Sequence, residues 1–211
     1  TDESPSKASL SYNSSVLNAH TVIIGGGVIG ASTAYQLAVR GCTDVILIER
    51  EAFFGQGATG KCAGGIRCQF ASEANIRMSM LSLSMLTRFE EEHEQAIDLR
   101  RCGYLFMLTS PDEKDAFKRN LTLQHSLGVM TEWIDGDEVR HMLPLMQLDD
   151  VLAGTFNPDD GLADPNGVMI GYINSARRLG VRTLTDVTAT GISVDSGQVR
   201  AVQTTQGTIA C

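Results

Sequence analysis

The chain has 211 residues, of which 43% are hydrophobic and 20% charged. This is the composition of an ordinary globular protein with room for one large domain or two small ones. A net charge of −8 and a pI near 4.9 argue against nucleic-acid binding, which needs clustered Lys and Arg, and no apolar run approaches the roughly 18 residues of a membrane-spanning helix.

The two ends of the chain and its cysteines indicate which segments fold and in which compartment the chain lies. Residues 1–19 are rich in Ser and Asn and lack the basic and apolar regions of a signal peptide, so we expect a disordered lead-in. The five cysteines include no C-x-x-C pair, which predicts neither a disulfide framework nor a metal site and indicates a reducing, cytoplasmic compartment. The last residues alternate like a strand that has just left a turn, which suggests a fragment.

A glycine-rich turn follows the first predicted strand. The apolar residues 20–24 are typical of a strand buried on both faces, and residues 31–40 have helical composition. Between them, Gly25, Gly27 and Gly30 have the spacing G-x-G-x-x-G. We assign Gly25 to the tight turn, Gly27 to close approach of a pyrophosphate and Gly30 to close packing of helix on strand.

An acidic residue follows the second predicted strand, residues 45–48. Glu49 lies 19 residues after Gly30, and a dinucleotide-binding fold places a carboxylate about 20 residues beyond the glycines to bind the ribose hydroxyls. The helix that begins near Val28 would direct its N–H groups and its dipole at the phosphates. The alternative is a glycine turn without a ligand in a doubly wound sheet, and the placement of Glu49 argues against it.

A second glycine-dense loop follows this strand, where a nicotinamide enzyme would proceed to another helix. Ala58-Thr59-Gly60 is followed by Gly64-Gly65-Ile66-Arg67. Together with the first glycine motif and Glu49-Arg50, these residues closely resemble the FAD-dependent amine oxidoreductases of the D-amino-acid oxidase superfamily, such as the sarcosine oxidase β subunit, glycine oxidase and dye-linked proline dehydrogenase. The resemblance implies that FAD is the cofactor and that the second loop passes the pyrophosphate and runs along the flavin.

The resemblance also implies individual roles. The expected FAD-binding residues are Gly25, Gly27, Val28, Ile29, Gly30, Glu49, Arg50, Ala58, Thr59, Gly60, Gly64, Gly65, Ile66 and Val187. Arg67 is expected to clamp a substrate carboxylate, for which its planar two-donor fork is suited; the alternative is a salt bridge to a nearby acid or to the flavin phosphates. Its loop neighbours Lys61, Cys62 and Gln69 are solvent-facing or packed in the simplest interpretation. We expect His93 and His141 to be structural or exposed, and assign no catalytic residue.

The middle of the chain has a different pattern. Residues 72–94 predict one long helix with an apolar face and a solvated acidic run at its end. Residues 95–155 are expected to be part of an inserted substrate domain. Its predicted elements are strands at 103–109 and 130–134 and helices at 111–126, after a Ser110 N-cap, and at 135–143.

The resemblance resumes at residues 156–165, which look like the family's D-G-x-x-D-P stretch before a helix. We expect this helix at 165–179, a strand at 181–184 and a hairpin of 199–205 with 208–210. The predicted fold is therefore α/β, with a Rossmann-like FAD-binding domain of the glutathione-reductase type, residues 20–94 and 156–211, around an inserted α+β substrate domain. Because family members continue well beyond this point, we expect a chain that is incomplete at its C-terminus and inactive by itself.

The function that the resemblance implies is oxidation of the C–N bond of a small amino acid or N-methyl amino acid, such as sarcosine, glycine or proline. The flavin would accept a hydride equivalent at N5, and electrons would pass to O2 or a partner subunit. The substrate, the mode of FAD attachment and the oligomeric state are left open. The alternatives are a flavoprotein that acts on a non-amine substrate such as a hydroxy acid, and a non-catalytic FAD-binding assembly factor.

Overall fold

The computed structural model describes residues 17–211, which divide into two compact units. Of the described residues, the first unit contains residues 17–54 and Ala176–Cys211, and the second contains Gly55–Ser175. Most of the expected lead-in, residues 1–16, lies outside the described residues, whereas Leu17–Asn18 forms strand β1. Among residues 17–211, no helix combines the length and the apolar character that a membrane crossing demands.

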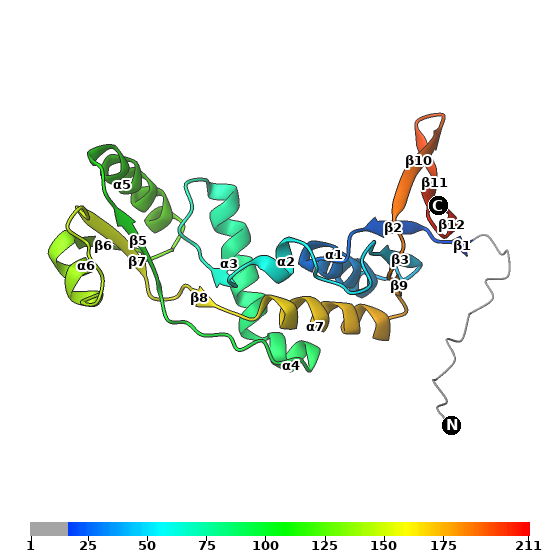
Figure 1. Cartoon of the computed structure of the whole chain (residues 1–211), viewed down its shortest axis with the longest axis horizontal. Coiled ribbons are helices and arrows are strands. Elements are labelled where there is room, and N and C mark those ends of the chain that lie inside the picture. The colour runs from blue at the N-terminus through cyan, green and yellow to red at the C-terminus, as the bar shows by residue number, and fades with distance from the viewer. Residues whose placement is uncertain (1–16) are drawn as a thin grey trace, which may run out of the picture. The chain divides into compact units, whose positions relative to one another are not determined.

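A parallel sheet forms the centre of the first unit (Figure 1). Its strand order is β2-β3-β9, with β2 at Thr21–Ile24, β3 at Val45–Ile48 and β9 at Arg182–Leu184. All four residues of β3 are buried, as expected for a central parallel strand that is covered on both faces. Helix α1, Val28–Val39, packs its small residues Ala34 and Ala38 into one core cluster with Val45 of β3.

The other sheet of the first unit has the order β1-β12-β11-β10. The predicted hairpin is present as β11, Gln198–Thr204, and β12, Gly207–Ala210, which pair antiparallel. Strand β10, Ala189–Asp195, pairs with β11 and was not predicted. Val202 of β11 packs with Ile46 of β3 in one buried cluster, so the two sheets share a core.

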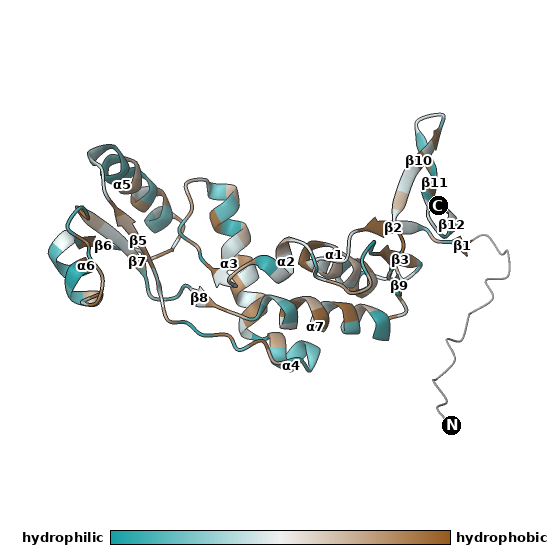
Figure 2. Ribbon diagram, viewed as in Figure 1, coloured by the Kyte–Doolittle hydropathy of each residue, from teal (hydrophilic) through white to brown (hydrophobic). Residues whose placement is uncertain are grey.

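An antiparallel sheet organises the second unit. Its order is β5-β7-β6, with β5 at Tyr104–Leu108, β7 at Ala153–Asn157 and β6 at Glu132–Asp135. Helix α5, Pro111–Ser126, begins at a capping box of Ser110 and Glu113 and is mostly hydrophilic (Figure 2). Helix α6, Gly136–Met142, is capped by Asp135 and packs Val139 against Ile134 and Val151.

The second unit also contains a short helix and two short strands, which precede helix α7 in the chain or pair with each other. Helix α2, Ala58–Lys61, precedes β4, Gly65–Ile66, which pairs antiparallel with β8, Gly161–Leu162. Helix α7, Pro165–Arg178, follows β8. It is the helix that the D-G-x-x-D-P stretch predicted.

The prediction of one helix over residues 72–94 is wrong. The structure has α3, Glu73–Thr87, and α4, Phe89–His93, with Arg88 between them outside helical geometry. Phe89 is fully buried, and its ring meets the ring of Tyr172 of α7 edge-on at 4.9 Å. We attribute the break to this packing, since a periodic sequence does not reveal where the helix must change direction to bury an aromatic ring.

Candidate cofactor and substrate site

The first glycine turn joins β2 to α1 as the sequence predicts. Gly25 has φ +108°, a conformation that favours glycine, and its N–H donates to the Ile48 carbonyl at 2.8 Å. A Cβ at Gly30 would lie 2.0 Å from the Gly25 carbonyl oxygen and 3.3 Å from Leu47 Cδ1. Gly27 is the N-cap of α1 and has no side chain with which to cover the helix terminus.

Glu49 is fixed at the carboxyl end of β3, beside this turn. Its Oε2 accepts the Gly26 N–H at 2.7 Å, and its Oε1 accepts the Glu51 N–H at 3.0 Å. Its own main chain receives the Val187 N–H at 2.9 Å. Because a carboxylate has about four lone-pair positions, Glu49 keeps acceptor capacity for a ligand. Val187 is buried, and its contact with Glu49 is through the backbone.

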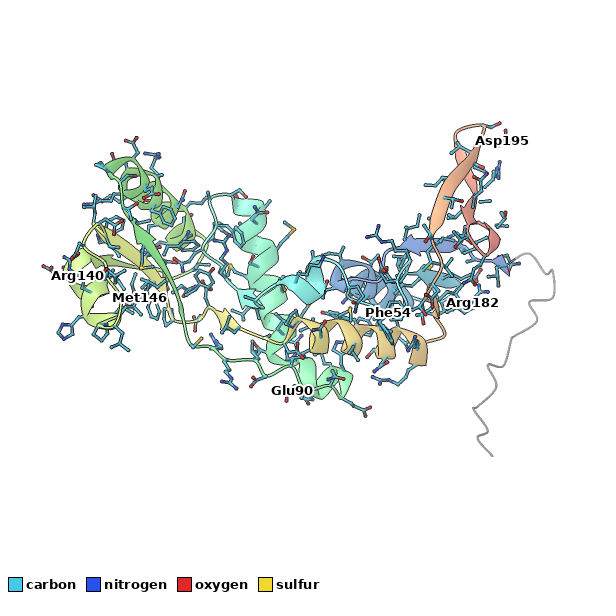
Figure 3. The ribbon with its side chains drawn as sticks, viewed as in Figure 1. Phe54, Glu90, Arg140, Met146, Arg182 and Asp195 are labelled. Atoms are coloured by element: carbon cyan, nitrogen blue, oxygen red, sulfur yellow. The ribbon has the colours of Figure 1, made fainter. Side chains whose placement is uncertain are left out.

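Phe54 is a residue of this region that sequence reasoning missed (Figure 3). A Cβ at Gly26 would lie 2.2 Å from Phe54 Cδ1, so the ring packs directly on the glycine turn. The guanidinium of Arg177 lies 5.6 Å from the centre of the same ring. Arg50, by contrast, points to solvent and pairs with Glu51 at 3.0 Å. No sequence spacing links Phe54 to the turn, and only its position soon after the acidic strand could have drawn attention to it.

The residues of the first unit fit the adenosine and diphosphate part of FAD. A helix N-terminus behind a bare glycine favours phosphate, and a carboxylate at the strand end suits the ribose. Ile29, one of the expected contacts, is 77% exposed at the start of α1. A large apolar side chain exposed there is available to a ligand.

The second glycine loop is built in the same way. The Gly60 N–H donates to the Gly55 carbonyl at 2.8 Å, and a Cβ at Gly60 would lie 2.4 Å from that oxygen. Gly64 has φ +77°, and its Cβ would lie 2.1 Å from the Ala163 carbonyl oxygen. Thr59, which directly precedes Gly60, is buried. The loop is therefore fixed by main-chain contacts that a larger residue at position 60 or 64 would break.

Arg67 lies among aromatic rings. Its guanidinium carbon is 4.5 Å from the ring centre of Phe70, 5.0 Å from that of Phe106 and 6.0 Å from that of Tyr104. Within residues 17–211, no carboxylate or carbonyl pairs with it, so the alternative salt bridge to a protein acid is not formed there. Ring faces leave the in-plane N–H donors of a guanidinium available for an anion.

The neighbours of Arg67 have different surroundings. Lys61 and Cys62 are exposed, whereas Gln69 is buried and donates to the Tyr104 carbonyl at 2.7 Å. Gln69 also contacts Asp160, a fully buried acid that sequence reasoning did not single out. The only signal for Asp160 was its place as the first acid of the D-G-x-x-D-P stretch.

The two histidines considered from sequence differ in burial. His93 is buried, and its Nδ1 lies 2.9 Å from the Ser175 hydroxyl. Its ring packs on Phe89 at 4.2 Å, so its surroundings are those of a structural residue. His141 is exposed. Within the described part of the chain, no cluster of three or more His, Cys, Asp or Glu residues is arranged to hold a metal ion.

Curated relatives are similar in sequence to this chain over most of its length. The mitochondrial dimethylglycine dehydrogenase of Rattus norvegicus is 31% identical over 192 residues, which are 90% of this chain and 22% of that protein. The sarcosine oxidase β subunit of Rhodobacter capsulatus is 26% identical over 195 residues, 90% of this chain and 47% of that protein. The chain thus spans between about a fifth and about a half of the length of these relatives.

Among solved structures, the L-proline dehydrogenase of P. horikoshii superposes with a TM-score of 0.81 at 34% identity, covering 92% of this chain and 51% of that chain. The predicted α/β architecture, with a Rossmann-like cofactor domain and a second α+β unit, is therefore confirmed. The family model described as "FAD dependent oxidoreductase" matches residues 20–211. By this match, the chain belongs to the FAD-dependent oxidoreductase family of the D-amino-acid oxidase type.

Proposed function

We propose that this chain supplies the FAD-binding region and part of the substrate site of an enzyme that oxidises the C–N bond of a small amino acid or N-methyl amino acid. The observation that carries the proposal is Arg67, a guanidinium with no acidic partner among the described residues and with aromatic rings around it. Such a group is suited to a substrate carboxylate. Relatives named for dimethylglycine, sarcosine and proline support this substrate class.

In this proposal, each unit binds its own part of the cofactor. The glycine turn at residues 25–30 and Glu49 bind the diphosphate and ribose, with Arg50 and Val187 beside them, and residues 58–60 and 64–66 lie along the rest of FAD. The flavin supplies the electron-accepting chemistry. The protein binds the carboxylate through Arg67 and so orients the C–H bond next to nitrogen, which is the usual contribution of a positioning cation.

The electron acceptor and the assembly belong to the proposal as well. One relative is named as a β subunit, which supports a partner subunit as one acceptor, with O2 as the other. All five cysteines are free, in keeping with our proposal of a reducing compartment such as the cytoplasm.

The test uses the full-length protein with FAD bound, under anaerobic conditions. Sarcosine, dimethylglycine, glycine and proline are added in turn, and bleaching of the flavin absorbance is followed. We expect at least one of these amines to reduce the flavin. Reduction by hydroxy acids but by none of these amines would support the alternative of a non-amine substrate. A flavin that no small molecule reduces, in a protein that copurifies stably with a partner, would support the assembly-factor alternative.

A substitution at Arg67 tests whether this residue binds the substrate carboxylate. Arg67→Met should raise KM for the amino acid about 30- to 160-fold, because a bidentate charge-assisted pair contributes roughly 2–3 kcal/mol. Arg101→Met is the matched control, since Arg101 lies in the same unit but pairs with Asp159 on the surface. Equal KM values for the two variants would contradict a role for Arg67 in binding the substrate.

A further inference from the structure

Asp160 is the centre of a buried polar network in the second unit. Its Oδ1 accepts the Cys68 N–H and the Asn157 Nδ2–H, each at 2.8 Å, and its Oδ2 accepts Gln69 Nε2–H at 3.3 Å. Asp160 is 0% exposed. Burial raises its pKa, while the three N–H bonds oppose that shift and favour the carboxylate form. The groups of Cys68, Asn157 and Gln69 that bond this carboxyl are all N–H donors, so both of its oxygens act as acceptors.

Gln69 extends this network to the sheet. Its Nε2 also donates to the Tyr104 carbonyl of β5 at 2.7 Å, and its Oε1 accepts the Thr155 hydroxyl of β7 at 2.8 Å. These contacts set the orientation of the Gln69 amide, because a flip would place Oε1 against two acceptors, the Tyr104 carbonyl oxygen and Asp160 Oδ2. Its orientation depends in turn on Asp160, which accepts its second N–H.

The network joins Arg67 to the rings around it. Cys68, held by Asp160 through its N–H, is the residue directly after Arg67, and Gln69 fixes the same segment to the main chain of Tyr104. Tyr104 and Phe106 of β5 provide two of the three rings around the guanidinium. Asp160 itself makes no ion pair with Arg67 among the described residues, so any effect on Arg67 passes through the backbone and through Gln69.

We propose that Asp160, with Gln69, is the positioning residue that holds Arg67 on its aromatic rings in the orientation that receives a substrate carboxylate. This proposal rests on the proposed function of Arg67 and adds a residue to it. The carboxylate acts as a fixed acceptor for the loop and does not touch the substrate. Loss of that acceptor should let the segment 67–69 shift relative to β5, which would weaken carboxylate binding without removing the guanidinium.

The main variant is Asp160→Asn, which keeps the size of the side chain and replaces one acceptor oxygen by an NH2 donor. Whichever way the amide turns, a donor then faces a donor of Cys68, Asn157 or Gln69. The probe is propionate, a carboxylate without an oxidisable amine, and its binding to the full-length FAD-containing protein is measured by the change in the flavin spectrum. We expect the Kd for propionate to rise at least tenfold, and the flavin reduction rate at saturating amine to stay within about threefold.

A double-variant cycle separates positioning from general damage. In an Arg67→Met background, Asp160→Asn should change the propionate Kd by less than twofold, because the group that it positions is gone. The control is Asp159→Asn, an exposed neighbour that pairs with Arg101 and bonds no part of the loop; it should leave the Kd unchanged. If Asp160→Asn does not fold, Thr155→Val, which removes one bond to Gln69 at nearly constant volume, should raise the Kd about threefold.

The outcomes are distinct. A tenfold effect that disappears without Arg67 supports the positioning role. An unchanged Kd in Asp160→Asn, or an equal effect with and without Arg67, overturns it while the proposed function stands. If the wild-type protein binds no propionate and oxidises none of the amines, the proposed function fails and this inference fails with it.

Discussion

Replacing Gly30 by alanine is expected to force α1 away from the turn that precedes it. The added Cβ would lie 2.0 Å from the Gly25 carbonyl oxygen, whereas ordinary nonbonded contacts are near 3.5 Å. The carbonyl is main chain and cannot rotate aside, since the Gly26 N–H of the same planar peptide is bonded to Glu49 Oε2 at 2.7 Å. The helix start must therefore move by more than about one ångström, and Leu47, 3.3 Å from the same Cβ, limits the other direction.

We estimate the cost from known overpacking effects. Forcing a methyl group into a well-packed site costs about 1–3 kcal/mol, and the upper half of this range is expected because the obstacle is backbone. With a urea m-value of about 1–3 kcal/mol/M, the unfolding midpoint should fall by about 1 M. If the displaced N-terminus of α1 binds the diphosphate, FAD affinity should fall at least about tenfold, which corresponds to roughly 1.4 kcal/mol.

The assay is urea unfolding of the apoprotein together with FAD titration by fluorescence. Gly57→Ala is the matched control, because its Cβ would meet no atom within 4 Å and its φ is −85°. Gly26→Ala should be intermediate in stability, since the obstructing atoms belong to the Phe54 ring, which can rotate. The reasoning is refuted if Gly30→Ala matches Gly57→Ala in both unfolding midpoint and FAD affinity.

Three further predictions concern the second unit. The N–H bonds from Thr109 and Ser110 lower the pKa of Glu113 below its ordinary value of 4.5, so its stabilising effect is complete above that value and is lost as pH falls through the lowered pKa. Urea unfolding of Glu113→Gln should therefore differ from wild type more at pH 7 than at pH 3, and a pH-independent difference would contradict this. Burial, assisted by the charge of Asp160, raises the pKa of the Cys68 thiol to about 11, so iodoacetamide at pH 8 should label the exposed Cys62 and Cys102 and spare Cys68 in peptide mass spectra; equal labelling of all three would oppose it. Gly161→Ala should lower the urea midpoint well below that of Gly57→Ala, because its Cβ would lie 1.9 Å from the Arg100 carbonyl oxygen, and equal midpoints would show that β8 can shift freely.

Elements with strong local signals were predicted to the residue. Strand β3 matches residues 45–48 because four consecutive apolar residues favour a strand that is buried on both faces. Helix α5 matches residues 111–126 because Ser110 and Glu113 form a capping box around a proline at the first turn. In both cases, the information lies within a few residues of the boundary.

Elements that depend on distant partners were not predicted. Strand β7, Ala153–Asn157, is the central strand of its sheet, yet its sequence AGTFN contains a glycine and little apolar alternation. Its strand form comes from pairing with β5 and β6 on either side. We attribute the division of α3 from α4 to a distant contact as well, because Phe89 packs against Tyr172 of α7.

The candidate site divides in the same way. The positions of the glycines and of Glu49 beside one strand-to-helix turn were predicted from their spacing, because that spacing is local to one strand–helix–strand segment. Phe54 and Asp160 were missed, because their contacts with Gly26 and with Cys68 span 28 and 92 residues of sequence. A single sequence has no pattern that joins such pairs.

The acids near the loop explain why the guanidinium of Arg67 is available to a ligand. Asp159 pairs with Arg101 on the surface, and Asp160 accepts N–H bonds from Cys68, Gln69 and Asn157. Arg67 receives ring faces in place of either acid. A guanidinium paired with a protein carboxylate would have to break that pair before binding a substrate acid, whereas one held by aromatic faces keeps its in-plane donors available. In our proposal, the second unit therefore divides two functions between these residues: Asp160 fixes the loop, and Arg67 presents the charge.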